Sequence, residues 1–97
     1  MSMVDSLRER LAVLAPERLD IRDDSARHAG HAGAREGGHY AVAIISARFA
    51  GLATMQRHRL VYDAVGDLMR NGIHALSISA RTPEESRNQP YFRPGNP

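Results

Sequence analysis

The 97-residue chain contains no cysteine and no lysine. Without cysteine it cannot build a disulfide framework, use a thiolate nucleophile, or close a metal or cluster site with its own sulfur. Any soft-metal chemistry would therefore have to be shared with another molecule. All thirteen basic residues are arginine, a preference that also arises from genome composition and carries little functional weight alone.

Long apolar runs are missing as well. No run approaches the roughly 20 residues that a membrane span requires, and the amino-terminal residues lack the apolar core of a secretory signal, so we expect a cytoplasmic protein of one domain. Eleven acidic residues nearly balance the basic ones, leaving a net charge of +2. The long-range field that drives nucleic-acid binding should therefore be weak.

Signatures of catalysis are also absent from the sequence. There is no cysteine nucleophile, no glycine-rich phosphate loop between a strand and a helix, and no convincing carboxylate pair beside a base. Asp23 and Asp24 near His28 are typical of ordinary turn chemistry. We predict a protein without catalytic activity.

The first half of the chain predicts a helix, a strand, a loop and a second strand. Ser2 and Asp5 form a capping box ahead of apolar residues at helical spacing, and Pro16 ends that helix. Residues 18–22 alternate as a short strand. Residues 24–38 contain four glycines and no large apolar side chain, which indicates a mobile loop. The apolar run 39–46 predicts a central strand buried on both faces.

The second half predicts one helix or two abutting helices, a strand and a last helix. The apolar positions that define the helical face are Leu52, Met55, Val61, Tyr62, Val65, Leu68 and Met69. The residues that follow alternate over 74–80, which places His74 first on the apolar face of a strand whose other face is wet. Thr82 and Glu85 then form a capping box. We expect a domain over residues 1–88 and a disordered, proline-rich tail over 89–97.

The predicted order is α-β-β-α(α)-β-α, an α+β fold in which helices pack on one face of a three-stranded sheet. This order also suits the class II KH topology. The GxxG loop that clamps nucleic acid in KH domains is missing, since the sequence GLAT occupies residues 51–54.

Several segments together resemble the BolA-like family over nearly the whole chain. They are DDSARH (23–28), HYAVAIIS (39–46), SARFAG (46–51), RHRLVYDAV (57–65) and GIHALSISARTPEE (72–85). The resemblance implies a KH-like fold and a heterodimer with a monothiol glutaredoxin, in which both proteins share a two-iron two-sulfur cluster with the help of glutathione. It also implies a rival role, because bacterial members of the family have been regarded as DNA-binding transcription regulators.

The resemblance also implies which residues bind the cluster. His74, in the IHAL motif, matches the family's recurrent ligand, and a loop histidine supplies the second nitrogen, with His28 the better match and His31 the alternate. Two imidazoles can replace two thiolates on one iron, as in Rieske centres. From the residues alone, the favoured interpretation of His74 is a histidine at the edge of the core that satisfies a backbone group, and only the resemblance favours a ligand. His39 is expected to be a structural or surface residue.

Arg57, His58 and Arg59 lie early in the main predicted helix. Such a run is most often a solvated face. Two functional interpretations compete with that one: a dock for the glutathione carboxylates or an acidic glutaredoxin surface, and a grip on DNA phosphates. The low net charge makes us expect DNA binding to be weak if it occurs.

Overall fold

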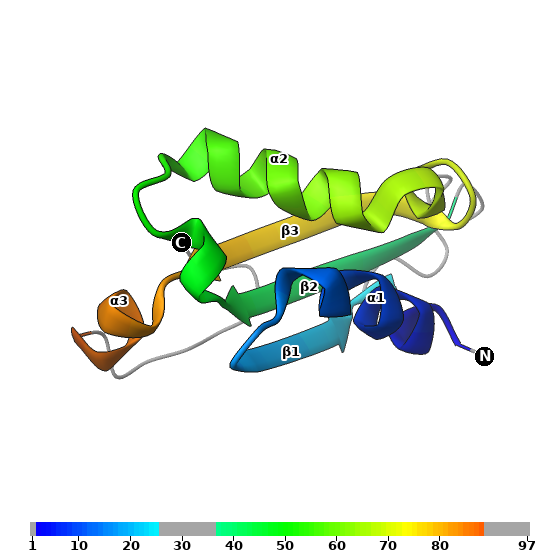
Figure 1. The fold of residues 1–97 in the computed structure, drawn as a ribbon. Helices are drawn as coiled ribbons and strands as arrows, with labels where there is room; N and C mark the ends of the chain where they lie inside the picture. Colours follow the sequence, from blue (N-terminus) through cyan, green and yellow to red (C-terminus); the bar gives the residue numbers. More distant parts are fainter. Residues whose placement is uncertain (1, 26–36, 89–97) are drawn as a thin grey trace.

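The computed structural model describes residues 2–25 and 37–88, and three strands form its sheet in the order β1-β2-β3 (Figure 1). β1 (Arg18–Asp23) runs antiparallel to β2 (Gly38–Ile45), and β2 runs parallel to β3 (Ile73–Arg81). The predicted α+β fold with its three-stranded sheet is confirmed. The loop histidines His28 and His31 and the expected tail over 89–97 lie outside the described residues.

Two of the helices cover one face of this sheet, with α1 against β1 and α2 against β3 (Figure 1). α1 (Met3–Leu11) begins at the predicted capping box, in which Ser2 and Asp5 exchange hydrogen bonds of 3.1 and 3.3 Å. A 3-10 turn (Ala12–Leu14) continues it toward Pro16. α2 (Thr54–Val65) ends at Gly66 and abuts the 3-10 turn Gly66–Met69, so the predicted long helical segment is two pieces.

The short helix α3 (Pro83–Asn88) follows β3 beyond the end of the sheet (Figure 1). Its predicted capping box is present, because the Thr82 amide donates to Glu85 Oε1 at 2.9 Å and the Glu85 amide donates to Thr82 Oγ1 at 3.2 Å. The 3-10 turn Ala47–Phe49 connects β2 toward α2 and buries Phe49 completely.

The core lies between the two helices and the sheet. β2 is its centre: Val42 and Ile44 point into the cluster, and Ala41 and Ala43 on the opposite face are also buried. The strand is therefore buried on both faces, as predicted. The buried residues of the cluster are Leu7, Leu11, Leu14, Val42, Ile44, Phe49, Val61, Val65, Ile73, Leu76 and Ile78.

A register shift at the start of β3 corrects the predicted position of His74. Gly38 pairs with Ile73 and His39 pairs with Ala75, so His74 is the extra residue of a bulge. Because of the bulge, Ile73 takes the buried core position at 4% exposure and His74 is exposed. The expectation that His74 begins the apolar face of the strand is wrong. The face of the strand that was predicted to face solvent is only partly exposed, because Ser77 is exposed and Ser79 is buried.

Candidate metal site and partner surface

His74 is the first of the predicted site residues that the structure places, at the amino-terminal end of β3 and on the surface. Its imidazole lies beside that of His39 in β2, with ring centroids 5.1 Å apart and ring planes tilted by 48°. The sequence pattern gave His39 no functional role. The two residues meet because the bulge at His74 brings it level with His39 in the parallel pair.

Ser25 and Gly37, the described residues that flank positions 26–36, both lie at this pair of histidines. On one side, Ser25 Oγ accepts a hydrogen bond of 3.1 Å from the His39 amide. On the other, Gly37 has a φ of +129°, and a Cβ atom there would lie 3.0 Å from the His74 backbone nitrogen. Ser25 thus lies at His39, and Gly37 lies at His74. His28 is three residues from Ser25, a covalent reach of at most about 10 Å.

Imidazole nitrogen is a ligand that suits iron, zinc and copper. In residues 2–25 and 37–88, no three side chains of the His, Cys, Asp or Glu type gather as a metal site. The described part of the chain therefore offers an incomplete set of ligands.

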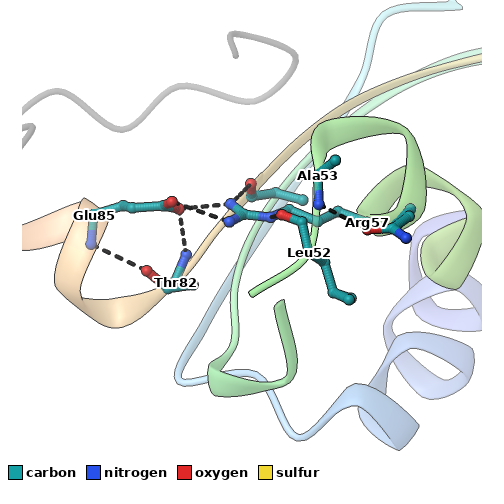
Figure 2. Close-up of polar contacts among 7 residues, drawn as sticks. Leu52, Ala53, Arg57, Thr82 and Glu85 are labelled. Atoms are coloured by element: carbon teal, nitrogen blue, oxygen red, sulfur yellow. Dashed lines mark hydrogen bonds and ion pairs between the residues drawn. The ribbon is translucent and has the colours of Figure 1, made fainter. Parts of the chain in front are cut away.

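Arg57 is held inside the fold, and Figure 2 shows its guanidinium between the start of α2 and the start of α3. Its Nη atoms donate to both carboxylate oxygens of Glu85, at 2.6 and 3.0 Å. Its Nε donates to the Leu52 carbonyl at 2.8 Å, and Nη1 also donates to the Ala80 carbonyl at 3.2 Å. The side chain is only 13% exposed. Arg57 therefore ties α3 and the end of β3 to the first turn of α2.

The contacts with Arg57 and Thr82 also change the pKa of Glu85. The hydrogen bonds from Arg57 and from the Thr82 amide lower the pKa of Glu85 from its ordinary 4.5 to about 2. Glu85 is thus ionised throughout the physiological range. It serves at once as the capping residue of α3 and as the partner of Arg57.

His58 and Arg59, which follow Arg57 in the basic run, lie at the surface of α2 and not inside the fold. Arg59 is exposed and His58 is half-buried, and with Met55 and Tyr62 they line a surface hollow of about 320 Å³ on α2. Met55 and Tyr62, which the sequence pattern grouped with Val61 and Val65 on one face of the helix, are 78% and 41% exposed, whereas Val61 and Val65 are buried. The Tyr62 hydroxyl lies 3.5 Å from the Leu76 carbonyl, which places this end of the hollow two residues from His74 in β3.

Of the predicted residues, the structure thus gives His74 an exposed position and His58 and Arg59 a common surface, and it separates Arg57 from them. Sequence reasoning missed His39 as the neighbour of His74. The sequence held a weak signal of the bulge, though not of the contact with His39, since Ile73 and Leu76 are both apolar and break the alternation that the strand otherwise follows.

The topology, the buried central strand and the pair of histidines define a small α+β protein with a KH-like order of elements. The model of the family described as BolA-like protein matches residues 11–85. The chain belongs to the BolA family.

Individual relatives agree with this assignment. The chain is 43% identical over 79 residues to BolA-like protein 1 of Mus musculus, covering 81% of this chain and 56% of that relative. It is 37% identical over 82 residues to a Vibrio cholerae protein named DNA-binding transcriptional regulator BolA, covering 84% and 76%. The structure of BolA1 from Arabidopsis thaliana superimposes with a TM-score of 0.78 at 41% identity, covering 89% of this chain and 97% of that one.

The chain spans about half the length of the mammalian relatives that it matches. None of the helices that the structure describes has the length and apolar character needed to cross a membrane.

Proposed function

We propose that this protein is a non-catalytic accessory factor in iron–sulfur cluster handling, which shares a two-iron two-sulfur cluster with a monothiol glutaredoxin. In this proposal His74 binds one iron, together with His28 or, as the alternate, His31. The glutaredoxin and glutathione supply the thiolates on the other iron. The cluster is cargo held between two proteins, which is consistent with the absence of cysteine.

The observation that carries the proposal is the exposure of His74 at a bulge. A ligand to a shared centre must be reachable from a second molecule, and the bulge turns this imidazole out of the core into such a position. Ser25 and Gly37, the described residues on either side of the positions that bear the other candidate ligands, contact the backbone of His39 and His74, which supports a loop ligand near His74. Two histidines from one partner and two thiolates from the other would complete the four ligand positions of the cluster.

The hollow on α2 supports a contact surface beside the cluster. Its Tyr62 end lies close to β3 near His74, and it combines exposed apolar surface from Met55 with the positive charge of Arg59. We infer that His58 and Arg59 contact an acidic part of the glutaredoxin or the glutathione carboxylates. Arg57 contributes indirectly in this arrangement, since it holds the first turn of α2 in place.

Reconstitution with a monothiol glutaredoxin, glutathione, iron and sulfide tests the proposal. We expect a heterodimer whose visible absorption and circular dichroism differ from those of the cluster that the glutaredoxin binds alone. His74→Ala should remove these differences. His58→Ala leaves the proposed iron ligands in place, so it should weaken formation of the heterodimer without changing the spectrum of the complex that forms. An unchanged spectrum in His74→Ala would refute the assignment of His74.

Regulation of transcription by direct DNA binding is a second candidate function, because the Vibrio cholerae relative bears that name. Arg59 lies on the surface, but Arg57 has its donors committed to the fold, and the net charge is only +2. We expect duplex binding to be weak and to fall steeply with salt. Tight sequence-selective binding at physiological salt that Arg59→Ala abolishes would favour this second function.

A further inference from the structure

The face of the sheet that points away from α1 and α2 carries small side chains that water does not reach. Alternate residues of a strand point to opposite faces, so Ala41 and Ala43 point away from the core cluster that contains Val42. Ser79 of β3 pairs with Ala43 and lies on the same face. Ala41, Ala43 and Ser79 are only 2%, 0% and 1% exposed. The helices α1, α2 and α3 do not account for this, since the first two cover the other face and α3 lies beyond the end of the sheet (Figure 1).

These small side chains cannot hide one another from solvent. A methyl or hydroxymethyl group is short, and strands lie about 4.8 Å apart, so such a row stays open unless something lies on top of it. The arginines of the neighbouring strand β1 are engaged along or just beyond that strand. Arg18 Nε donates to Asp20 at 3.0 Å, and Arg22 Nε donates to Asp24 at 2.8 Å. We therefore look for the cover in a segment of chain outside the three strands.

The covered row continues toward α3. Arg81, the last residue of β3, lies on the same face and is 8% exposed, whereas Ser77 at the other end of the row is exposed. Ser79 Oγ is hidden from solvent and has no hydrogen-bond partner among the described residues. Burying such a hydroxyl is unfavourable, so the cover has to gain apolar contacts that offset the loss. The pattern of burial therefore points to an apolar cover that comes from the side of α3.

The chain that follows α3 is long enough to reach this row. α3 ends at Asn88, and nine residues, 89–97, come after it. Fully extended, they span at most about 30 Å, at about 3.3 Å per residue. The way back along the six residues of α3 is about 9 Å. The distance along β3 from Arg81 to the level of Ser77 is about 13 Å. The tail can thus extend over the whole covered row.

The composition of the tail suits a cover and not a fourth strand. Its three prolines lack the amide hydrogen that pairing in a sheet needs. Tyr91 and Phe92 have large flat rings that can pack on alanine methyl groups. We propose that residues 89–97 lie across Ala43 and Ser79 and close this face of the sheet, with the two aromatic rings supplying the apolar contact. The proposal replaces the expectation of a disordered tail, which rested on its proline content.

A tail in this position determines which surfaces the protein offers to other molecules. An apolar sheet face without helices is a ready surface for self-association or for a partner, and here the chain occupies it with its own residues. The inference does not rest on the cluster proposal. His74 lies at the start of β3, whereas α3 and the tail follow the end of that strand.

The absence of cysteine makes the cover measurable in the full chain. Ser79→Cys introduces a single thiol of nearly the size of the hydroxyl, and its rate of reaction with a soluble thiol reagent reports access to the row. Ser77→Cys, at the exposed residue two positions away, is the reference. We expect Ser79→Cys to react at least about tenfold more slowly, and the double change Tyr91→Ser with Phe92→Ser to remove most of this protection. Tyr62→Ser, the matched control, removes an exposed ring from α2 and should leave the protection unchanged.

Three results would overturn the proposal. The first is an equal reaction rate in Ser79→Cys and Ser77→Cys, and the second is protection that survives the double change in the tail. The third is protection that grows with protein concentration together with a dimer in analytical ultracentrifugation, which would assign the cover to a second copy of the chain. If Ser79→Cys does not fold, nuclear Overhauser effects in the wild-type chain decide. Contacts between the Ala43 methyl group and the ring of Tyr91 or Phe92 support the cover, and their absence refutes it.

Discussion

Replacement of Arg57 by alanine should destabilise the fold by about 3 kcal/mol. The ion pair alone accounts for a small part, because the Glu85 side chain is 45% exposed and solvent screens the pair to about 1 kcal/mol. The larger part comes from the carbonyls of Leu52 and Ala80, which lose a charged donor, at about 1 kcal/mol each. For a domain of this size, the sum corresponds to a melting temperature lower by about 10–20 °C.

Thermal and urea unfolding followed by circular dichroism measure this effect. Arg59→Ala is the matched control, because it removes the same side chain from an exposed position two residues away in α2. It should change the stability by less than about 0.5 kcal/mol. Arg57→Lys should recover only part of the loss, because an ammonium cannot make the bidentate contact. Equal, small effects of Arg57→Ala and Arg59→Ala would refute the structural role of Arg57.

Three further predictions concern the acid, the exposed histidine and the glycine beside it. Since the folded-state pKa of Glu85 is lowered to about 2, its stabilisation should be present above pH 4.5 and be lost as the pH falls toward 2, and Glu85→Gln should flatten this part of a stability–pH curve. His74→Ala should change the unfolding free energy of the isolated chain by less than about 1 kcal/mol, because the residue is exposed; a much larger loss in urea denaturation would indicate a structural role. Gly37→Ala should cost about 1–3 kcal/mol, because its φ is positive and the added Cβ would meet backbone at 3.0 Å; a variant as stable as wild type in the same assay would contradict this.

The order of elements could be predicted because its signals are local. The capping boxes at Ser2 and at Thr82 mark helix starts within four residues of sequence, and both are present in the structure. The apolar run of β2 likewise identifies a central strand without knowledge of its neighbours. These features needed no information about which segments meet in space.

The environment of His74 could not be predicted in the same way, because a bulge depends on pairing between strands. Alternation over residues 74–80 puts His74 on the apolar side, and only the parallel register with β2 shows that Ile73 occupies the core position instead. The proximity of His39 follows from the same register. Their separation of 35 positions along the chain leaves no local trace in composition or periodicity.

The contact between Arg57 and Glu85 could not be predicted from the sequence either. In the sequence it is one member of a basic run, and such a run is typical of a solvated surface. Its partner Glu85 is 28 residues away and was already identified as the capping residue of the last helix. A capping glutamate has a second carboxylate oxygen, and here that oxygen accepts from Arg57. The pattern therefore identified both residues but not their contact.

The exposure of His74 bears on whether this residue is structural or a ligand. A histidine kept to satisfy a buried backbone group would gain from being covered, since hydrogen bonds strengthen where water is excluded. Here the bulge interrupts the ladder between β2 and β3 and turns the imidazole outward, next to a second imidazole. An irregularity in a sheet costs backbone pairing, and such irregularities often re-aim a side chain toward a functional site. The exposed imidazole at the start of β3 therefore supports the proposal that His74 binds a ligand from outside the chain.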